Sequence, residues 1–378
     1  MTVSPKKDST YNTNNNNSRI NDNSITTSQL SKTFGNFKAV DSLTIKVDSG
    51  DIFGFLGPNG AGKTTTIRML CGLLTPSSGS GKVGGYDIIK DSTKIRHIIG
   101  LLPESSGFYG WMNAEEYLTH FALLYKIDSD VARKRTKDLL EKMGLAEKAF
   151  APISYYSRGM KQRLGLARIL INEPHIIFLD EPTLGLDPKG QVEIRKVLLE
   201  LNREKGVTIL LSSHALREVS SLCNKIAIID RGQLVAQGSR GELRLQSGLE
   251  QKIVIRVADN LRARQCLANL PFTAAIETDN GSHLINIIIH NLSPVSAVRN
   301  NNNNVDDDYH DCGINSILSH LMNQGLQIHD VQRPEIDLEE IFFRLIDSRQ
   351  NNDDDNDAGA GLVEKRVREE KPREVRPH

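Results

Sequence analysis

Several features of secreted, membrane-spanning and zinc-binding proteins are missing from this chain of 378 residues. Its cysteines are scattered, with no CxxC pair and no histidine cluster nearby, which argues against a disulfide framework or a zinc site (Cys71, Cys223, Cys266 and Cys312). No apolar run approaches the roughly 18 residues of a membrane span. The start, MTVSPKKDST, lacks the apolar core of a signal peptide. We therefore expect a protein that stays inside the cell with reduced thiols and does not cross a membrane by itself.

Net charge is missing as well. The chain has 47 basic and 47 acidic residues, so its formal charge is zero. Proteins that bind nucleic acid or anionic lipid through bulk electrostatics need a basic face, and this balance argues against one. We expect no nucleic-acid partner, although the composition leaves room for a local basic patch.

Short β-rich runs alternate with helical patterns between residues 25 and 238, which predicts an α/β domain with a sheet packed between helices. Several runs are almost continuously apolar, as expected for strands buried on both faces. The predicted strands are 43–47, 51–57, 97–102, 175–180, 207–213 and 225–230. A mostly helical stretch between 113 and 144 predicts a helical subdomain over about 105–170.

A second, smaller α/β domain is predicted over residues 239–349. Its expected order is strand, helix, two strands, helix and strand, which is the ferredoxin-like split βαβ pattern, with a last helix from Asp337. The polar segment 299–312 is expected to be a solvated loop. Residues 1–24 and 350–378 have few apolar side chains to bury, so we expect both ends to be disordered.

The strongest chemical signal is GPNGAGKT, which fits the phosphate-loop pattern GxxxxGK[ST] between a predicted strand and a predicted helix. Its glycines allow backbone N–H groups and the positive end of the helix to face a phosphate. We expect Lys63 to bridge the β- and γ-phosphates, Thr64 to place its hydroxyl on Mg²⁺, and Thr65 to reach the α-phosphate. The predicted phosphate-binding residues are Gly57, Pro58, Asn59, Gly60, Ala61, Gly62, Lys63, Thr64 and Thr65.

Two carboxylates end the apolar run HIIFLDE, downstream of the phosphate loop. Asp180 at the strand tip is expected to hold Mg²⁺ through water. Glu181 is expected to polarise the attacking water as a general base. Acids at a strand end are common, so this assignment depends on the phosphate loop that precedes them.

A third segment, YSRGMKQRLGLAR, leads into an amphipathic helix. Ser157 and Gly159 lie at its start, where a hydroxyl and free N–H groups can bind an anion, although an ordinary helix cap would look the same. The order of the segments decides between these possibilities. A phosphate loop, a Ser-x-Gly helix start, an apolar strand with Asp-Glu, then LGLD and SSH follow one another. In this order the chain resembles the ATP-binding cassette (ABC) ATPases over about residues 25–238.

The resemblance implies that two ATP molecules lie between two head-to-tail cassettes. It implies that Ser157 and Gly159 contact the γ-phosphate held by the opposite subunit and that Asp187, in LGLD, lies at the same interface. His214, in SSH, matches the histidine that bonds the γ-phosphate, and Phe34, in KTFG, matches the aromatic that stacks on adenine. From the residues alone, a structural histidine and a buried phenylalanine at a turn are the alternatives.

Two motifs depart from the family pattern. The usual LSGGQ reads YSRGM, so Arg158 replaces a glycine and Met160 a glutamine, and Glu104 in GLLPE stands where a glutamine is usual. We expect Glu104 to join the Mg²⁺ ligands, because a carboxylate near a divalent cation stays ionised and binds it strongly. Both departures resemble the bacterial and archaeal branch that includes drug-resistance and multidrug export ATPases, and EIDLEEIFFRL resembles the closing helix of that branch.

The resemblance implies an ATPase subunit of an exporter that depends on ATP and Mg²⁺. It would form a dimer with a second copy or a related cassette, peripherally on the cytoplasmic face of the membrane, and its integral membrane permease subunits would be separate chains. Phe108, Tyr109 and Trp111 are expected to dock those subunits, with ordinary core packing as the alternative. The other candidate function is a soluble cassette ATPase acting on the ribosome or on nucleic acid. The single cassette, the lack of a heptad arm and the zero net charge disfavour it.

Overall fold

The computed structural model describes residues 25–249, 251–268, 273–279, 284–289, 308–332 and 337–347. The chain divides into two compact units, residues 1–240 and 241–378. The ends that were expected to be disordered, and the first part of the expected polar loop (299–307), lie outside the described residues. Within the described ranges, no helix combines the length and apolarity that a membrane crossing needs.

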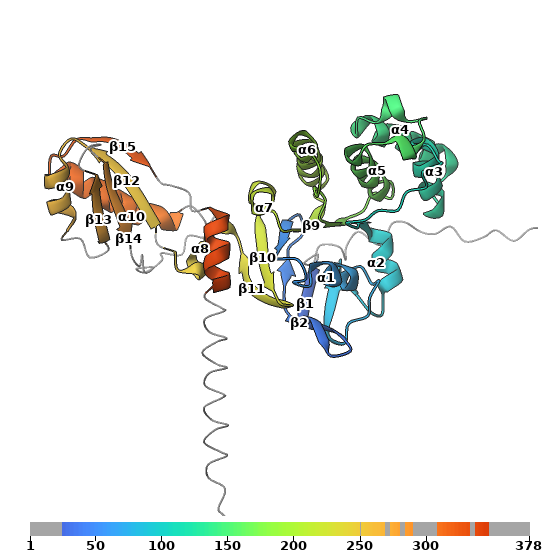
Figure 1. Cartoon of the computed structure of the whole chain (residues 1–378), viewed down its shortest axis with the longest axis horizontal. Helices are drawn as coiled ribbons and strands as arrows, with labels where there is room; N and C mark the ends of the chain where they lie inside the picture. Colours follow the sequence, from blue (N-terminus) through green and yellow to red (C-terminus); the bar gives the residue numbers. More distant parts are fainter. Residues whose placement is uncertain are drawn as a thin grey trace, which may run out of the picture. The chain divides into compact units, whose positions relative to one another are not determined.

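A six-stranded sheet forms the centre of the first unit (Figure 1). Its strands are β4 (Ile52–Leu56), β7 (Ile99–Leu102), β8 (Ile176–Asp180), β9 (Thr208–Ser213), β10 (Lys225–Asp230) and β11 (Gln233–Gly238). They pair in the order β11-β10-β4-β9-β8-β7, and all neighbours are parallel except the β10–β11 hairpin. Every residue of β4, β8 and β9 is buried, which agrees with the near-continuous apolar runs in the sequence.

An antiparallel sheet that the sequence did not predict completes this unit. It contains β1 (Ile25–Phe34), β2 (Phe37–Leu43), β5 (Ser78–Val83) and β6 (Tyr86–Asp87) in the order β2-β1-β5-β6, with β3 (Lys46–Val47) paired to β1. A shared apolar core that includes Leu30, Val83, Ile67 and Phe55 connects this sheet through α1 (Lys63–Leu70) to the six-stranded sheet.

The strand predicted at 43–47 is wrong, because β2 ends at Leu43 and β3 begins at Lys46. The Thr27 hydroxyl donates a 2.8 Å hydrogen bond to the carbonyl of Leu43 and accepts a 2.9 Å hydrogen bond from the N–H of Ile45. A side chain therefore satisfies the backbone groups that a continuous ladder would have used. The strand predicted from His97 also begins later, since α2 (Ser92–Ile98) includes its first two residues.

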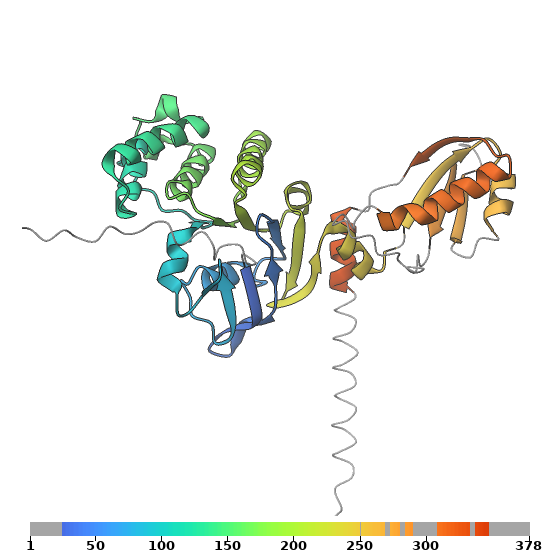
Figure 2. The same ribbon diagram turned by 180° about the vertical axis from the view of Figure 1, so that it is seen from behind.

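Three helices of the first unit lie together as a subdomain. Figures 1 and 2 show α3 (Ala114–Leu124), α4 (Ser129–Lys142) and α5 (Arg158–Leu170) gathered away from the antiparallel sheet. The others are α1, α2, α6 (Pro188–Lys205) and α7 (Leu216–Leu222), and short 3-10 turns lie at Ala146–Lys148 and Ile153–Tyr155. Asn113 and Glu116 form a capping box that starts α3, which satisfies two N–H groups at the helix end.

The second unit has its own antiparallel sheet, in the order β13-β14-β12-β15. Its elements are α8 (Arg240–Ser247, which spans the boundary), β12 (Gln251–Val257), α9 (Asn260–Leu267), β13 (Thr273–Asp279), β14 (Leu284–Ile289), α10 (Asp308–Asn323), β15 (Ile328–Gln332) and a helix over 338–347. Because α10 begins at Asp308, the end of the segment 299–312 is helical and not a loop. Acidic residues are favoured in the first turn of a helix, so an aspartate-rich sequence does not exclude a helix start.

Candidate functional site

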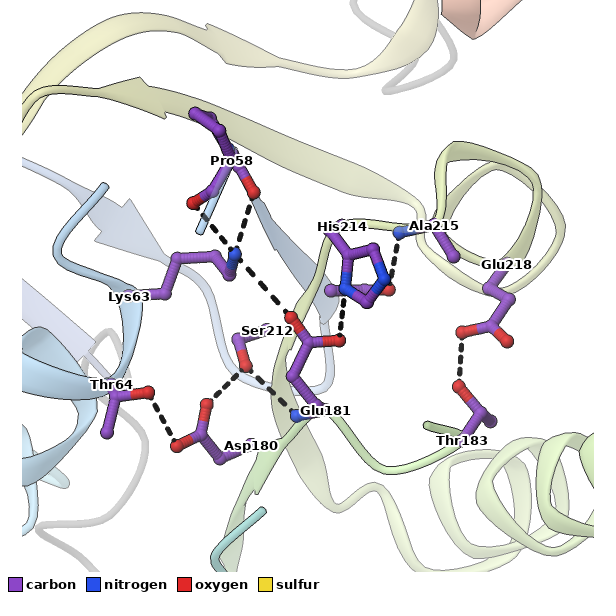
Figure 3. Close-up of polar contacts among 12 residues, drawn as sticks. Pro58, Lys63, Thr64, Asp180, Glu181, Thr183, Ser212, His214, Ala215 and Glu218 are labelled. Atoms are coloured by element: carbon purple, nitrogen blue, oxygen red, sulfur yellow. Dashed lines mark hydrogen bonds and ion pairs between the residues drawn. The ribbon is translucent and has the colours of Figure 1, made fainter. Parts of the chain in front are cut away.

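The candidate site lies where β4, β9 and β8 end, side by side in the six-stranded sheet (Figure 3). The phosphate loop (residues 57–65) follows β4, His214 follows β9, and Asp180 ends β8. In open α/β sheets, ligands bind beyond the carboxyl ends of the strands. The fold therefore gathers segments that are far apart in the sequence at the edge where a ligand is expected.

The phosphate loop enters α1 through Gly62, which has a φ of 100°. A Cβ atom there would lie 2.5 Å from the carbonyl oxygen of Ala39 on β2, so both the backbone conformation and the space require glycine. No side chain caps the start of α1. The first N–H groups of this helix are therefore available to an anion, and the helix dipole favours one.

Lys63 is buried and its ammonium group faces the interior of the loop. Its Nζ donates to the carbonyl oxygens of Gly57 (2.7 Å) and Pro58 (3.2 Å) and lies 3.5 Å from Oε1 of Glu181. Figure 3 shows the side chain extended toward these three oxygen atoms. An ammonium group in this position is suited to binding phosphate oxygens.

Asp180 is buried at the end of β8 and is in contact with the phosphate loop. The Thr64 hydroxyl donates a 2.8 Å hydrogen bond to Oδ2 of Asp180. The charge of Asp180 also reaches Cys71 at the end of α1: burial first, and this carboxylate second, raise the pKa of the thiol. The protonated thiol is therefore the favoured form of Cys71.

Glu181 and His214 are in direct contact. The Nδ1 atom of His214 lies 2.9 Å from Oε2 of Glu181, while Oε1 of the same carboxylate faces Lys63. Glu181 has a φ of 51°, in the left-handed region that non-glycine residues rarely adopt. This turn directs its side chain into the site, away from the line of β8, and strained backbone of this kind clusters at functional sites.

Ser212 is a member of the site that the sequence did not indicate. It lies on β9 opposite Asp180 in the parallel ladder, and its hydroxyl donates a 2.6 Å hydrogen bond to Oδ1 of Asp180. The Ser212 hydroxyl oxygen also accepts a hydrogen bond from the N–H of Glu181. The motif SSH placed this serine near His214, but only the register between β8 and β9 shows which carboxylate it contacts.

A second cluster forms at the starts of α5 and α6. Ser157 caps α5 by accepting from the N–H of Met160, and Asp187 caps α6 by accepting from the N–H of Gly190. A cavity of about 430 Å³ lies between these helix starts, lined by Ser157, Arg158, Gly159, Arg163, Gly185, Leu186, Asp187, Lys189, Gly190, Glu193 and Ile194. In the described part of the chain, no hydrogen bond or ion pair connects Ser157, Gly159 or Asp187 to the phosphate loop.

Two predicted residues lie outside these clusters. Phe34 ends β1 and is 49% exposed, so the buried alternative is wrong, and the Lys32 ammonium lies 5.2 Å from the centre of its ring. Glu104 is exposed on the segment after β7, and among the described contacts none connects it to Asp180 or Glu181.

Comparison with known proteins points to one family. Residues 40–184 match the family profile described as ABC transporter. The chain is 32% identical over 319 residues to the linearmycin resistance ATP-binding protein LnrL of Bacillus subtilis (strain 168), which covers 84% of this chain and 96% of that protein. It is 33% identical over 325 residues to the daunorubicin resistance ATP-binding protein DrrA3 of Streptomyces coeruleorubidus, covering 86% and 96%.

The fold is also similar to that of solved structures. An ATP-binding subunit of an ABC transporter is similar with a TM-score of 0.55 and 29% identity, over 60% of this chain and 93% of that chain. An ATP-binding cassette of an ABC transporter in its ADP conformation gives a TM-score of 0.54 at 25% identity, over 60% and 94%.

Proposed function

This chain belongs to the ATP-binding proteins of ABC transporters, and we propose that it is the ATP-hydrolysing subunit of an exporter. The observation that carries the proposal is the meeting of Lys63, Asp180, Glu181 and His214 beside the phosphate loop. The two relatives named for linearmycin and daunorubicin resistance support the export direction.

The phosphate loop is the proposed site for ATP. Its backbone N–H groups and Lys63 would hold the phosphates, and Phe34 would stack on adenine. The Thr64 hydroxyl and the Asp180 carboxylate are adjacent oxygen donors, which fit Mg²⁺, a cation that prefers oxygen ligands and keeps several waters. We assign Glu104 to the same cation. When bound, Mg²⁺ would supply positive charge against the charge that develops on the phosphates.

Glu181 is the proposed general base. In this role it accepts a proton from the attacking water as the water oxygen bonds to the γ-phosphorus and the bond to ADP breaks, which gives ADP and phosphate. His214 orients Glu181 through the 2.9 Å contact at Nδ1, and we assign Nε2 to the γ-phosphate. The Glu181 side chain is only 10% exposed beside Lys63, which limits the access of bulk water to this carboxylate.

The second cluster is the proposed contribution to a neighbouring cassette. Ser157, Gly159 and Asp187 are gathered around one cavity and are not bonded to their own phosphate loop in the described part of the chain. A second copy of the chain, or a related cassette, placed head to tail would bring this cluster to the γ-phosphate of the opposite ATP. Two helix starts that face one cavity favour an anionic group there.

We assign docking of separate membrane permease subunits to an exposed aromatic surface of the helical subdomain, on the cytoplasmic face of the membrane. Trp111 is 79% exposed and Tyr155 is 82% exposed, and Tyr109 and Phe150 are exposed as well. Backbone hydrogen bonds connect the two loops that carry them, from Ser154 to Gly110 and from Ile153 to Met112. Exposed aromatic groups of this kind are typical of interfaces.

Phe108 differs from this surface. It is half-buried against Tyr117, with ring centres 5.5 Å apart, and so belongs to the packing of the subdomain. The sequence had placed Phe108 in the docking surface and had not indicated Phe150 or Tyr155. A cassette ATPase acting on the ribosome or nucleic acid is not favoured, since the two relatives reported above are named as resistance proteins.

Replacement of Glu181 by glutamine tests the function. Steady ATP hydrolysis by purified Glu181→Gln protein should fall on the order of a hundredfold or more, the usual scale for a positioned base. ATP binding should persist, because Lys63 and the phosphate loop are unchanged. Glu147→Gln, an exposed glutamate of the helical subdomain, is the control and should hydrolyse ATP normally. Near-normal turnover by Glu181→Gln would refute the role of Glu181 as the general base. Co-purification of the protein with ribosomes alone would refute the proposed function in an exporter.

A further inference from the structure

Ser212 contacts both acids of the site through a single hydroxyl group. It is fully buried in β9, and its Oγ donates to Oδ1 of Asp180 at 2.6 Å while accepting from the N–H of Glu181 at 3.1 Å. Figure 3 shows these two bonds meeting at the serine oxygen between the two acidic residues. A serine hydroxyl has one proton to donate, so the direction of both bonds is fixed.

The bond to the backbone acts on a strained residue. Glu181 has a φ of 51°, and its N–H also points at the carbonyl oxygen of Ser212, at 3.2 Å. Such a conformation persists only where the surroundings hold it. Both acceptors of this N–H belong to Ser212, so Ser212 helps to hold the turn that brings the Glu181 carboxylate to His214.

The bond to Asp180 separates the two oxygens of that carboxylate. Oδ1 accepts from Ser212 and Oδ2 accepts from Thr64 of the phosphate loop, so the rotation of the group is fixed from both sides. Because Ser212 occupies Oδ1, Oδ2 is the oxygen that faces the phosphate loop and the cation that we assign there. Among the described contacts, the Ser212 hydroxyl is bonded to Asp180 and Glu181 and not to the phosphate loop.

We propose that Ser212 is a positioning residue that orients Asp180 for the cation and Glu181 for catalysis. The proposal rests on the roles proposed above for these two acids. Its consequence is a selective one: loss of the hydroxyl should impair the chemical step and the effect of Mg²⁺, and should leave the binding of free ATP intact.

Ser212→Ala is the first test. We expect kcat to fall on the order of tenfold, as for the loss of a hydrogen bond to a charged group, with little change in KM. The gain in ATP affinity on adding Mg²⁺, measured by titration with and without EDTA, should shrink. Thr208→Val is the matched control, because it removes a buried hydroxyl at the other end of β9 that accepts from the N–H of Gly50. It should change unfolding but neither kcat nor the effect of Mg²⁺.

A double-mutant cycle separates this proposal from the proposed function. If Ser212 acts through Glu181, Ser212→Ala should reduce kcat much less in the Glu181→Gln protein than in the original one. Equal reductions in both backgrounds would overturn the positioning of Glu181 by Ser212, even if Glu181→Gln alone confirms the base. Ser212→Cys keeps a weak donor of similar size and provides a second variant should Ser212→Ala fold poorly. The kcat of Ser212→Cys should lie between those of the original protein and of Ser212→Ala. The proposal would be refuted if Mg²⁺ raised the ATP affinity of both variants as much as that of the original protein.

Discussion

The hydroxyl of Thr64 donates a hydrogen bond to Oδ2 of Asp180, and this bond joins the first turn of α1 to the end of β8. The two residues are 116 positions apart in the sequence. Asp180 is buried, so its carboxylate depends on protein donors while no cation is bound. Thr64 therefore satisfies this acid, and in the proposed function the same hydroxyl would also offer an oxygen to Mg²⁺.

Thr64→Val should affect stability and metal dependence together. Leaving a buried carboxylate oxygen without its donor should lower the free energy of unfolding by about 1–3 kcal/mol. The extra ATP affinity that Mg²⁺ provides should also fall. Urea denaturation and ATP titration with Mg²⁺ or EDTA measure the two effects. Thr64→Ser should restore both, whereas Thr66→Val, which removes a hydroxyl bonded to the Gly62 carbonyl, should alter stability alone.

Lys63→Ala should separate binding from chemistry. Removing the cation beside the phosphate loop should weaken ATP binding by about tenfold or more, since charge-assisted hydrogen bonds to phosphate are among the strong ones. Glu181→Gln should bind ATP at least as tightly as the original protein, because it removes the carboxylate that is paired with Lys63. Isothermal titration compares these variants, and Lys82→Ala, an exposed lysine on β5, is the control. Unchanged ATP affinity in Lys63→Ala would contradict the assignment.

Phe34 and Phe37 form a matched pair on one hairpin. They are cross-strand partners on β1 and β2, and they are 49% and 64% exposed. Only Phe34 is assigned to adenine, so Phe34→Ala should weaken ATP binding several-fold, about the range of a stacked aromatic pair. Phe37→Ala should leave it unchanged. The same titrations with inorganic triphosphate should show no difference between Phe34→Ala and the original protein, because this ligand has no base to stack.

Gly185 and Arg158 lie in contact inside the cavity at the starts of α5 and α6. A Cβ atom on Gly185 would meet the Arg158 guanidinium, and the φ of Gly185 is +70°. Gly185→Ala should therefore lower the free energy of unfolding by about 1 kcal/mol or more. Arg158→Ala opens this space, so the double variant should lose less stability than the sum of the single ones. Additive losses in urea denaturation would count against the contact.

Asp41 predicts a pH dependence of stability. Hydrogen bonds from Lys38 first and Gln233 second lower the pKa of Asp41 to about 2, below its ordinary 3.8. A lowered pKa stabilises the folded state above pH 4, and this contribution is lost as the pH falls from about 4 to 2. Asp41→Asn should lower Tm at pH 6 by at most about 2–4 °C, because the site is partly exposed. Between pH 4 and 2, the Tm of this variant should fall less than the Tm of the original protein. Thermal scans against pH check this, with the exposed Asp138→Asn as the control.

The parts of the fold that the sequence predicted are those with one dominant signal. The strands β4, β8, β9 and β10 are apolar runs buried on both faces, so their composition suffices. The antiparallel sheet has no such signal. Its strand β5 reads SGSGKV and is mostly exposed, and β1 mixes polar and apolar residues, so these strands form through their partners and not through composition.

The candidate site divides in the same way. The phosphate loop and the pair Asp180–Glu181 follow from local motifs, because the chemistry of each depends on residues that are adjacent in the chain. Ser212 does not, since its role depends on lying opposite Asp180 in a ladder between two strands. The positive φ of Glu181 could not be predicted from the sequence either, because nothing local favours that conformation for a glutamate.

The contact between Lys63 and Glu181 means that the protein carries its own counter-charge. In the proposed function, an incoming triphosphate would not meet a bare cation but would have to displace a carboxylate already paired with it. The contribution of Lys63 to the free energy of ATP binding is then the difference between its interaction with phosphate and its interaction with Glu181. Salt would screen both pairings, so the affinity should depend on ionic strength less steeply than the charge of the ligand suggests. In the proposed function this exchange would also coordinate the two halves of the reaction, because the event that occupies Lys63 would be the one that releases Glu181 to act on water.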